Sequence, residues 1–171
     1  YTDLEKECCM QIPGSMLHAW TADQSSQISD FIVYEDTSFN GIMKMGAVPT
    51  RTCMNYIDGM YRECLLAYFD GNKKIVYVKR NGSIIGRAVI RLTKTANRVV
   101  DQDSVLKFTD VTEEHEKQET VEEPVIETSV LFLERCYSGV QGNSRVKLEA
   151  ALIRFVAEKA KEMGCELIIA N

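Results

Sequence analysis

The residues with the clearest chemical potential lie in a loop in the last third of the chain. Gly139 and Gly142 precede Asn143, Ser144 and Arg145, where a long amphipathic helix is expected to begin. A helix start offers unpaired backbone N–H groups and a partial positive charge, which together bind phosphate groups. Glycine lets the backbone come close to such an anion. The loop is therefore a candidate phosphate site, and the alternative is that both glycines serve only a turn.

Two arginines form a second candidate for anion binding. Arg87 and Arg91 are four residues apart in a predicted strand, so both side chains fall on the same face. Together they could meet an anionic ligand. The alternative is that they pair with acidic neighbours, because the guanidinium group forms forked ion pairs with carboxylates.

The cysteines and histidines do not form a recognisable site. Cys8 and Cys9 are adjacent and have no metal-ligand spacing to His18, so we expect no metal centre. A nucleophile pair of Cys53 with His18 stays open, although nothing around Cys53 matches a catalytic signature. The chain shows no secretory signal and is large enough to fold without disulfides, so we expect reduced thiols and a cytoplasmic location.

The composition limits the possible partners. The 171 residues fit a single domain, 1–171, and their formal charge of −5 and pI near 5.2 argue against a nucleic-acid-binding surface. No apolar run reaches the length of a membrane span, so we expect no membrane partner. Acidic residues concentrate in segment 110–127, which we expect to be exposed.

A β-hairpin is the clearest local signal. The apolar runs 75–78 and 84–92 flank Asn81-Gly82, a pair that supplies the two positive φ angles of a type I′ turn. Simple alternation from that turn predicts one apolar face and one mixed face. The apolar face would hold Ile75, Tyr77, Ile84, Gly86, Ala88, Ile90 and Leu92. The mixed face would hold Val76, Val78, Ile85, Arg87, Val89 and Arg91.

A strand, a helix and a second strand follow. Residues 130–133 have the pattern of a buried strand, and 145–163 carry an apolar stripe with helical spacing. Asn143 or Ser144 is expected to cap that helix, and Gly164 to end it in a left-handed conformation. Residues 166–169 then predict a last strand, which gives a right-handed βαβ unit with parallel strands.

The first half, 1–72, is expected to be mainly helical or irregular. Short helices are predicted over residues 3–11, 24–34 and 58–69, and a strand over 65–69 is the alternative to the third helix. A short strand is also possible at 105–108. Together these elements predict an α/β fold, with a mixed β-sheet, a central β-hairpin, a βαβ unit and flanking helices.

The second half, 73–171, resembles the GCN5-related N-acetyltransferase superfamily. The resemblance rests on the hairpin sequence Asn-Gly-Ser-Ile-Ile-Gly-Arg-Ala, the buried strand, the glycine-containing loop, and a long helix that ends in Lys-Ala-Lys-Glu-Met-Gly-Cys before another strand. It implies an acetyltransferase-like core and acetyl-CoA as the cofactor. It also implies a small-molecule or peptide amine as the acceptor.

The resemblance assigns roles to residues around the buried strand. Glu134 would act as a general base for the attacking amine, and Tyr137 would donate a proton to the leaving thiolate. The backbone near Arg135 and Cys136 would face the pantetheine arm. The pyrophosphate would be bound by Gly139, Gly142, Asn143, Ser144 and Arg145.

A second functional hypothesis comes from the loop itself. The order of residues in 138–142 differs from the family's phosphate-loop pattern, so the fold could persist without the cofactor. The chain would then be a non-catalytic interaction or regulatory domain of a larger protein, with a protein partner or neighbouring domains.

Overall fold

The structure is a computed structural model that describes residues 12–98 and 125–170. Its helical elements are α2 (Gly14–Thr21), α3 (Phe39–Lys44), the 3-10 helix η1 (Arg62–Phe69) and α4 (Gly142–Met163). Its strands are β1 (Ser25–Ile28), β2 (Phe31–Asp36), β3 (Lys73–Arg80), β4 (Ser83–Arg98), β5 (Val125–Leu133), β6 (Tyr137–Ser138) and β7 (Glu166–Ile169).

One mixed sheet organises the described residues. Its strand order is β1-β2-β3-β4-β5-β7, and β6 pairs with β4 beyond the end of β5. Neighbouring strands are antiparallel except β5 and β7, which are parallel. The predicted α/β class, with a mixed sheet, a central hairpin, a βαβ unit and flanking helices, is confirmed.

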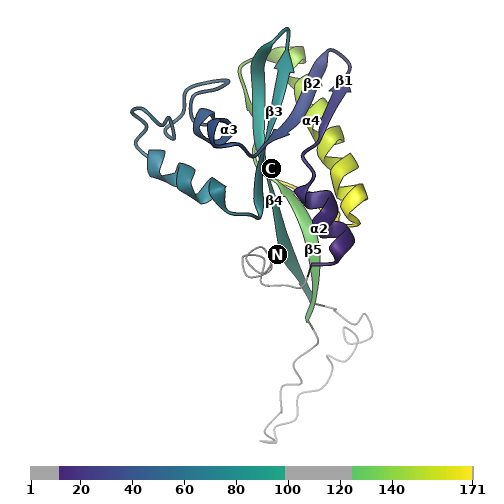
Figure 1. The fold of residues 1–171 in the computed structure, drawn as a ribbon. Helices are drawn as coiled ribbons and strands as arrows, with labels where there is room; N and C mark the ends of the chain where they lie inside the picture. Colours follow the sequence, from purple (N-terminus) through teal and green to yellow (C-terminus); the bar gives the residue numbers. More distant parts are fainter. Residues whose placement is uncertain (1–11, 99–124, 171) are drawn as a thin grey trace, which may run out of the picture.

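Helices pack against both faces of the sheet (Figure 1). On one face α4 and α2 cover a core that includes Trp20, Leu131 and Phe155. On the other face α3 and η1 cover a smaller core that includes Met45 and Leu65. A buried hydrogen bond connects the sheet to α3 in this smaller core: Tyr77 Oη donates to the carbonyl oxygen of Gly41 at 2.6 Å.

The β3–β4 hairpin confirms the predicted turn and corrects the predicted faces. Asn81 and Gly82 have φ angles of 52° and 79°, as the type I′ turn requires. The register then shifts by one residue at Val78/Lys79. Such a bulge moves every later side chain on one strand to the opposite face relative to its partner.

The bulge explains why simple alternation grouped the wrong residues. In β3, Val76 and Val78 share the α4 face, while Ile75 and Tyr77 share the η1 face, which is the reverse of the prediction. The β4 grouping was correct from Gly86 onward, but Ile84 belongs to the η1 face. The α4 face therefore holds Val76, Val78, Ala88, Ile90 and Leu92, and the η1 face holds Ile75, Tyr77, Ile84 and Val89.

The βαβ unit formed by β5, α4 and β7 is confirmed, with one correction at the start of its helix. Gly164 ends α4 with φ of 68°, as predicted. The helix begins at Gly142 rather than 145, and its N-cap is Gln141, whose side chain makes no capping hydrogen bond. Asn143 and Ser144 therefore lie inside the first turn, so the predicted cap was wrong.

The first half contains a hairpin that the sequence did not predict. Residues 24–34 form β1 and the start of β2, joined at Ser29, which has φ of 56°. Phe31, Val33 and Glu35 are buried in alternation, which is the period of a strand. In segment 58–69 only Arg62–Phe69 is helical, as a 3-10 helix. The predictions for 3–11 and 105–108, and that for 110–127 up to residue 124, lie outside the described residues.

A buried cluster of charged side chains links the sheet, α4 and the end of α2. Lys159 Nζ, in α4, lies 2.7 Å from Glu35 Oε1, and both side chains are fully buried. Lys74 Nζ lies 3.0 Å from Glu35 Oε2 and 2.7 Å from Asp23 Oδ1. Lys159 also donates hydrogen bonds to the carbonyl oxygens of Ala19 and Ala22 at the end of α2. Burial lowers the pKa of Lys159, and Glu35 opposes that shift.

Candidate functional site

The predicted site lies where β5 bends into β6. Strand β4 pairs with both of these strands: Ile90 lies opposite Leu133 of β5, and Arg87 lies opposite Tyr137 of β6. Three steps along β4 thus correspond to four steps along the opposing chain, which is a one-residue β-bulge. Glu134 begins the bulge, and its backbone N–H donates a hydrogen bond of 2.8 Å to the carbonyl oxygen of Val89. The bulge redirects the chain at the position of the candidate residues.

The parallel strands β5 and β7 part at this bulge. Their last pair is Leu133 with Ile169, followed by a hydrogen bond of 2.9 Å from the Ala170 N–H to the Leu133 carbonyl oxygen. Within the described part of the chain, the N–H groups of Arg135 and Cys136 donate no hydrogen bond to another backbone group. Two backbone donors are therefore free at the point where the strands separate.

A cavity of about 530 Å³ lies between the separating strands and α4. That volume falls in the range of small-molecule sites. Leu133, Leu152, Ile153 and Ile169 supply apolar side chains, and the remaining lining residues are Glu134, Arg135, Cys136, Arg145, Glu149 and Ala170. Four predicted site residues, Glu134, Arg135, Cys136 and Arg145, are thus brought together.

The glycine loop is only partly joined to this cavity. Gly139 is fixed against β4, because its N–H donates a hydrogen bond of 2.9 Å to the Ile85 carbonyl oxygen. A Cβ added to Gly139 would lie 3.2 Å from Pro49 Cβ, so this glycine serves a tight structural contact. Neither Gly139 nor Gly142, Asn143 or Ser144 lines the cavity.

The start of α4 nevertheless retains the features of an anion site. Gly142 has φ of 59° and open space around its Cβ position. The first turn has no acidic residue. Arg145 brings a guanidinium group to the rim of the cavity, where its Nε lies 2.8 Å from Glu149 Oε1. The positive end of the helix therefore adjoins the cavity through Arg145.

Glu134 and Tyr137 both face neighbours on the η1 side of β4. The Glu134 carboxylate is hydrogen-bonded to Arg91, in an ion pair that is partly exposed. The Arg87 guanidinium lies 4.2 Å from the centre of the Tyr137 ring, and its Nε donates a hydrogen bond of 3.0 Å to the Val48 carbonyl oxygen. Each candidate catalytic side chain is thus held by one arginine of β4.

The two arginines have different environments. Arg91 pairs with an acidic neighbour, which was one of the two alternatives. Arg87 is 3% exposed, and no carboxylate among the described residues forms an ion pair with it. Burial therefore lowers the pKa of Arg87, and the nearby tyrosines partly oppose that shift.

The thiol of Cys136 is protonated at neutral pH. Burial raises its pKa to about 11, and the nearby Glu149 carboxylate adds to the shift. Because the thiolate is the nucleophilic form of cysteine, Cys136 is suited to forming part of the cavity wall and not to attacking a substrate. The cysteines at 53, 64, 136 and 165 are all free thiols.

Sequence reasoning did not find the α4 side of the cavity. Glu149, Leu152 and Ile153 lie one and two turns beyond Arg145, so helical spacing from Arg145 was the signal that could have found them. Ile169 and Ala170 were recognisable only as the end of a strand.

Among the residues that the structure describes, no helix is long and apolar enough to cross a membrane. No group of three or more histidine, cysteine, aspartate or glutamate side chains there is placed to hold a metal ion.

Comparison with known proteins gives one overall likeness. No protein-family model and no curated protein matches the sequence. A crystal structure described as a transcriptional regulator from Bacillus halodurans C-125 is similar with a TM-score of 0.46 and 13% identity. The alignment covers 86% of this chain and 81% of that chain.

Proposed function

We propose that this chain transfers an acyl group from acetyl-CoA to the amine of a small molecule or peptide, as a divergent relative of the GCN5-related N-acetyltransferases. The observation that carries the proposal is the cavity between the separating ends of β5 and β7, next to two free backbone donors. The free thiols are suited to a reducing compartment such as the cytoplasm.

Two groups of residues around the cavity would bind two parts of the cofactor, the pantetheine arm and the pyrophosphate. The N–H groups of Arg135 and Cys136 would hydrogen-bond to the amide groups of the pantetheine arm, since no backbone group in the described part of the chain accepts a hydrogen bond from them. The uncapped first turn of α4, with Gly142 and Arg145, would hold the pyrophosphate by its N–H groups and positive charge. When bound, acetyl-CoA supplies a thioester whose acyl carbon accepts the amine.

Glu134 and Tyr137 would move the protons. The acceptor amine must lose a proton, and Glu134, a residue of the cavity wall, supplies the candidate carboxylate for that proton. Arg91 holds this carboxylate on the η1 side of β4, so the amine is expected to approach from that side. Tyr137 follows three residues later in β6 and would donate the proton that leaves with the thiol.

Direct transfer of the acyl group to the amine is consistent with the neutral thiol of Cys136. An acyl-enzyme route would need a cysteine thiolate in the cavity, but burial raises the pKa of Cys136 to about 11. The Cys136 side chain would instead contact the ligand as a small apolar group.

Binding of acetyl-CoA is the first test, measured by isothermal titration calorimetry. The wild-type chain is expected to bind, and Gly142→Asp is expected to abolish binding by placing a carboxylate at the phosphate position. Gly142→Asn is the matched control, because it has the same shape without the charge and asparagine tolerates positive φ. The proposal fails if the wild type shows no binding at millimolar ligand. Equal affinity in Gly142→Asp would show that the phosphate position is wrong.

Turnover tests the role of Glu134 separately. Glu134→Gln removes the proton acceptor and keeps the shape, so we expect acetyl-CoA to bind with unchanged affinity while kcat falls about 10²-fold or more. The readout is thiol release with a panel of amines. A variant with wild-type kcat would remove Glu134 from the mechanism.

The alternative function, a non-catalytic interaction or regulatory domain, has one observation in its favour. Both candidate catalytic side chains are already engaged, Glu134 by Arg91 and Tyr137 by Arg87. A chain that binds no acetyl-CoA but binds a protein partner would support this alternative.

A further inference from the structure

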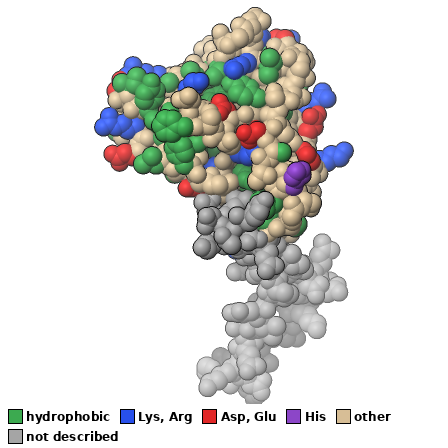
Figure 2. Space-filling view, viewed as in Figure 1, with side chains coloured by type: hydrophobic (Ala, Val, Ile, Leu, Met, Phe, Trp, Pro, Cys, Tyr) green, Lys and Arg blue, Asp and Glu red, His purple; other side chains and the backbone are tan. Residues whose placement is uncertain are grey.

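One side of the molecule displays large apolar side chains that the fold does not use. Seven of them are 43% to 83% exposed and come from the short stretch between α3 and the end of η1. We call this group the η1 surface. Its members are Phe39, Tyr56, Ile57, Met60, Tyr61, Leu66 and Phe69. Figure 2 shows hydrophobic side chains gathered on the left of the molecule, over the α3 and η1 region of Figure 1.

The backbone beneath the η1 surface is fixed in shape. The N–H of Thr52 donates to the Gly46 carbonyl oxygen at 2.9 Å, and the N–H of Tyr61 donates to the Cys53 carbonyl oxygen at 2.7 Å. A Cβ on Gly46 would lie 2.0 Å from a backbone oxygen, and a Cβ on Gly59 would lie 2.4 Å from another, so only glycine fits at either position. Arg87 ties this segment to β4 through Val48.

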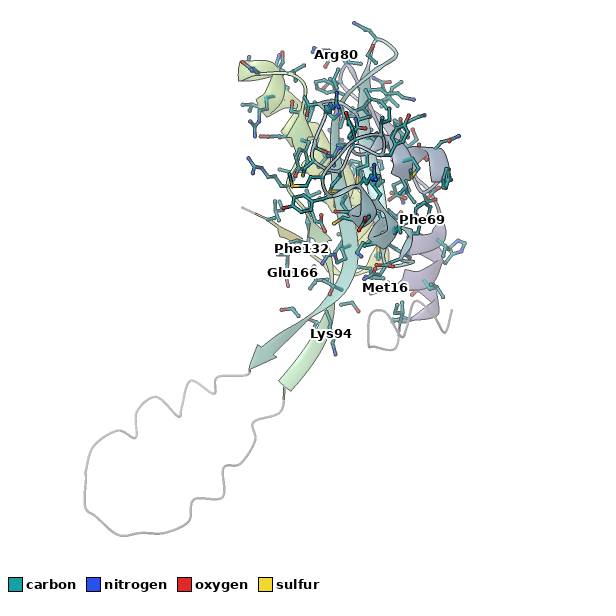
Figure 3. The ribbon with its side chains drawn as sticks, turned by 90° about the vertical axis from the view of Figure 1, so that its left-hand side faces the viewer. Met16, Phe69, Arg80, Lys94, Phe132 and Glu166 are labelled. Carbon is teal, nitrogen blue, oxygen red and sulfur yellow. The ribbon has the colours of Figure 1, made fainter. Side chains whose placement is uncertain are left out.

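Because the backbone is already ordered, the exposed side chains form a prearranged surface. A loop that gains order only on binding would spend part of the association free energy on ordering, whereas a prearranged surface does not. Phe39 and Phe69 already pack against each other, with ring centroids 5.8 Å apart. Figure 3 shows Phe69 on the side of the molecule that faces the viewer, in front of the sheet.

The exposed area is that of a protein interface. Taking ~200 Å² for each fully exposed side chain of this size, the seven residues expose roughly 800 Å². A standard interface buries about 800 Å² on each partner. Monomeric proteins rarely expose apolar patches larger than a few hundred Å².

The charges among these residues suit a self-complementary contact. Exposed residues of both signs are interspersed with the apolar side chains: Lys44, Arg62 and Glu63, together with Arg51 and Asp58, which form an ion pair within the chain. A two-fold axis brings each surface against itself, so an interface with balanced charges can pair them across the axis. A membrane of anionic lipids would instead favour a strongly basic rim.

We propose that the η1 surface is the interface of a two-fold symmetric homodimer of this chain. The proposal does not depend on the cofactor or on catalysis, because it rests on the area, the fixed backbone and the balanced charges. The occupant is a second copy, which buries the apolar side chains of both.

Sedimentation equilibrium of the purified full chain is the test, over about 1 to 100 µM. The wild type is expected to be dimeric in this range. The double variant Met60→Glu/Leu66→Glu places four carboxylates in the interface, two from each copy, so we expect the dissociation constant to rise at least about a hundredfold. Met60 and Leu66 are 83% and 69% exposed, so the fold itself does not need them.

Val146→Glu is the matched control. Val146 is 63% exposed in α4, away from the η1 surface, and its substitution is expected to leave the dimer unchanged. The thermal unfolding midpoint of each variant shows that it is folded. The proposal is overturned by a wild-type monomer at 100 µM, by a double variant that remains dimeric, or by equal weakening in Val146→Glu. A monomer that binds vesicles or another protein through this surface would also overturn it.

Discussion

Cys136 gives the candidate site a property that can be measured without a substrate. Burial raises the pKa of its thiol to about 11. At neutral pH its thiolate fraction is therefore ~100-fold lower than that of an ordinary cysteine.

We predict that iodoacetamide alkylates Cys136 slowly at pH 7.5 and that the rate rises tenfold per pH unit up to about pH 11. Mass spectrometry of the Cys136 peptide gives the rate, and exposed Cys53 in the same sample checks that the reagent is active. A rate that levels off near pH 8 or 9 would contradict the buried, neutral thiol. Acetyl-CoA is expected to slow the reaction further by filling the cavity.

Individual site residues were predictable where they follow a strong element. Glu134, Arg135 and Cys136 line the cavity, and their neighbouring positions follow from the apolar strand that they continue. Gly139 does not line it, and its contact with Pro49, ninety residues earlier in the chain, could not be predicted. Whether a glycine serves a ligand or a tight contact depends on the other surface, which local sequence does not contain.

At the scale of elements, the buried charges between β2, β3 and α4 support a stability prediction. Glu35 forms ion pairs with both Lys159 and Lys74, and all three side chains are buried. Glu35→Gln would leave the fully buried Lys159 ammonium without a counter-charge and Lys74 with only the partly exposed Asp23 carboxylate, so we expect a loss of about 3–5 kcal/mol in the free energy of unfolding.

Urea denaturation measures this loss. The control is Glu158→Gln, which breaks the exposed pair with Arg154 and is expected to cost less than about 0.5 kcal/mol. Similar small losses in both variants would show that the buried cluster does not stabilise the docking of α2.

Elements with a local sequence signal were predictable, and elements without one were not. The hairpin turn and α4 were predictable because their signals are local: two positive-φ positions and a long apolar stripe. The β1–β2 hairpin was missed because Ile28, Phe31 and Ile32 also fit helical spacing. The faces of β3 were inverted because a bulge leaves no mark in the sequence.

For the whole molecule, the distribution of charge matters more than its total. Segment 99–124 contains nine acidic and two basic residues, a charge of −7, so the rest of a chain with net charge −5 carries +2. The cofactor proposed for the cavity is a multiple anion. Its binding should therefore be weakened by this segment through long-range repulsion.

Removing the segment tests this idea. Arg98 and Val125 are paired neighbours at the ends of β4 and β5, so an Asn-Gly turn can join them directly. We expect the shortened chain to bind acetyl-CoA several-fold more tightly at low salt, with the difference vanishing at about 0.5 M salt because the charges are then screened. Calorimetry at two salt concentrations measures it, and a difference that does not depend on salt would rule out the electrostatic cause.

The two bulges beside β4 have a consequence for how chains with this fold can vary in length. The register of β4 changes by one residue against β3 at Val78/Lys79, and by one against the β5–β6 strand between Leu133 and Tyr137. Adding or deleting a single residue near either bulge would turn Arg87 and Arg91 toward α4 or move Glu134 away from the cavity. Substitutions should therefore accumulate in these stretches without changes of length. Insertions and deletions should instead collect between Arg98 and Val125, where the strand ends already meet.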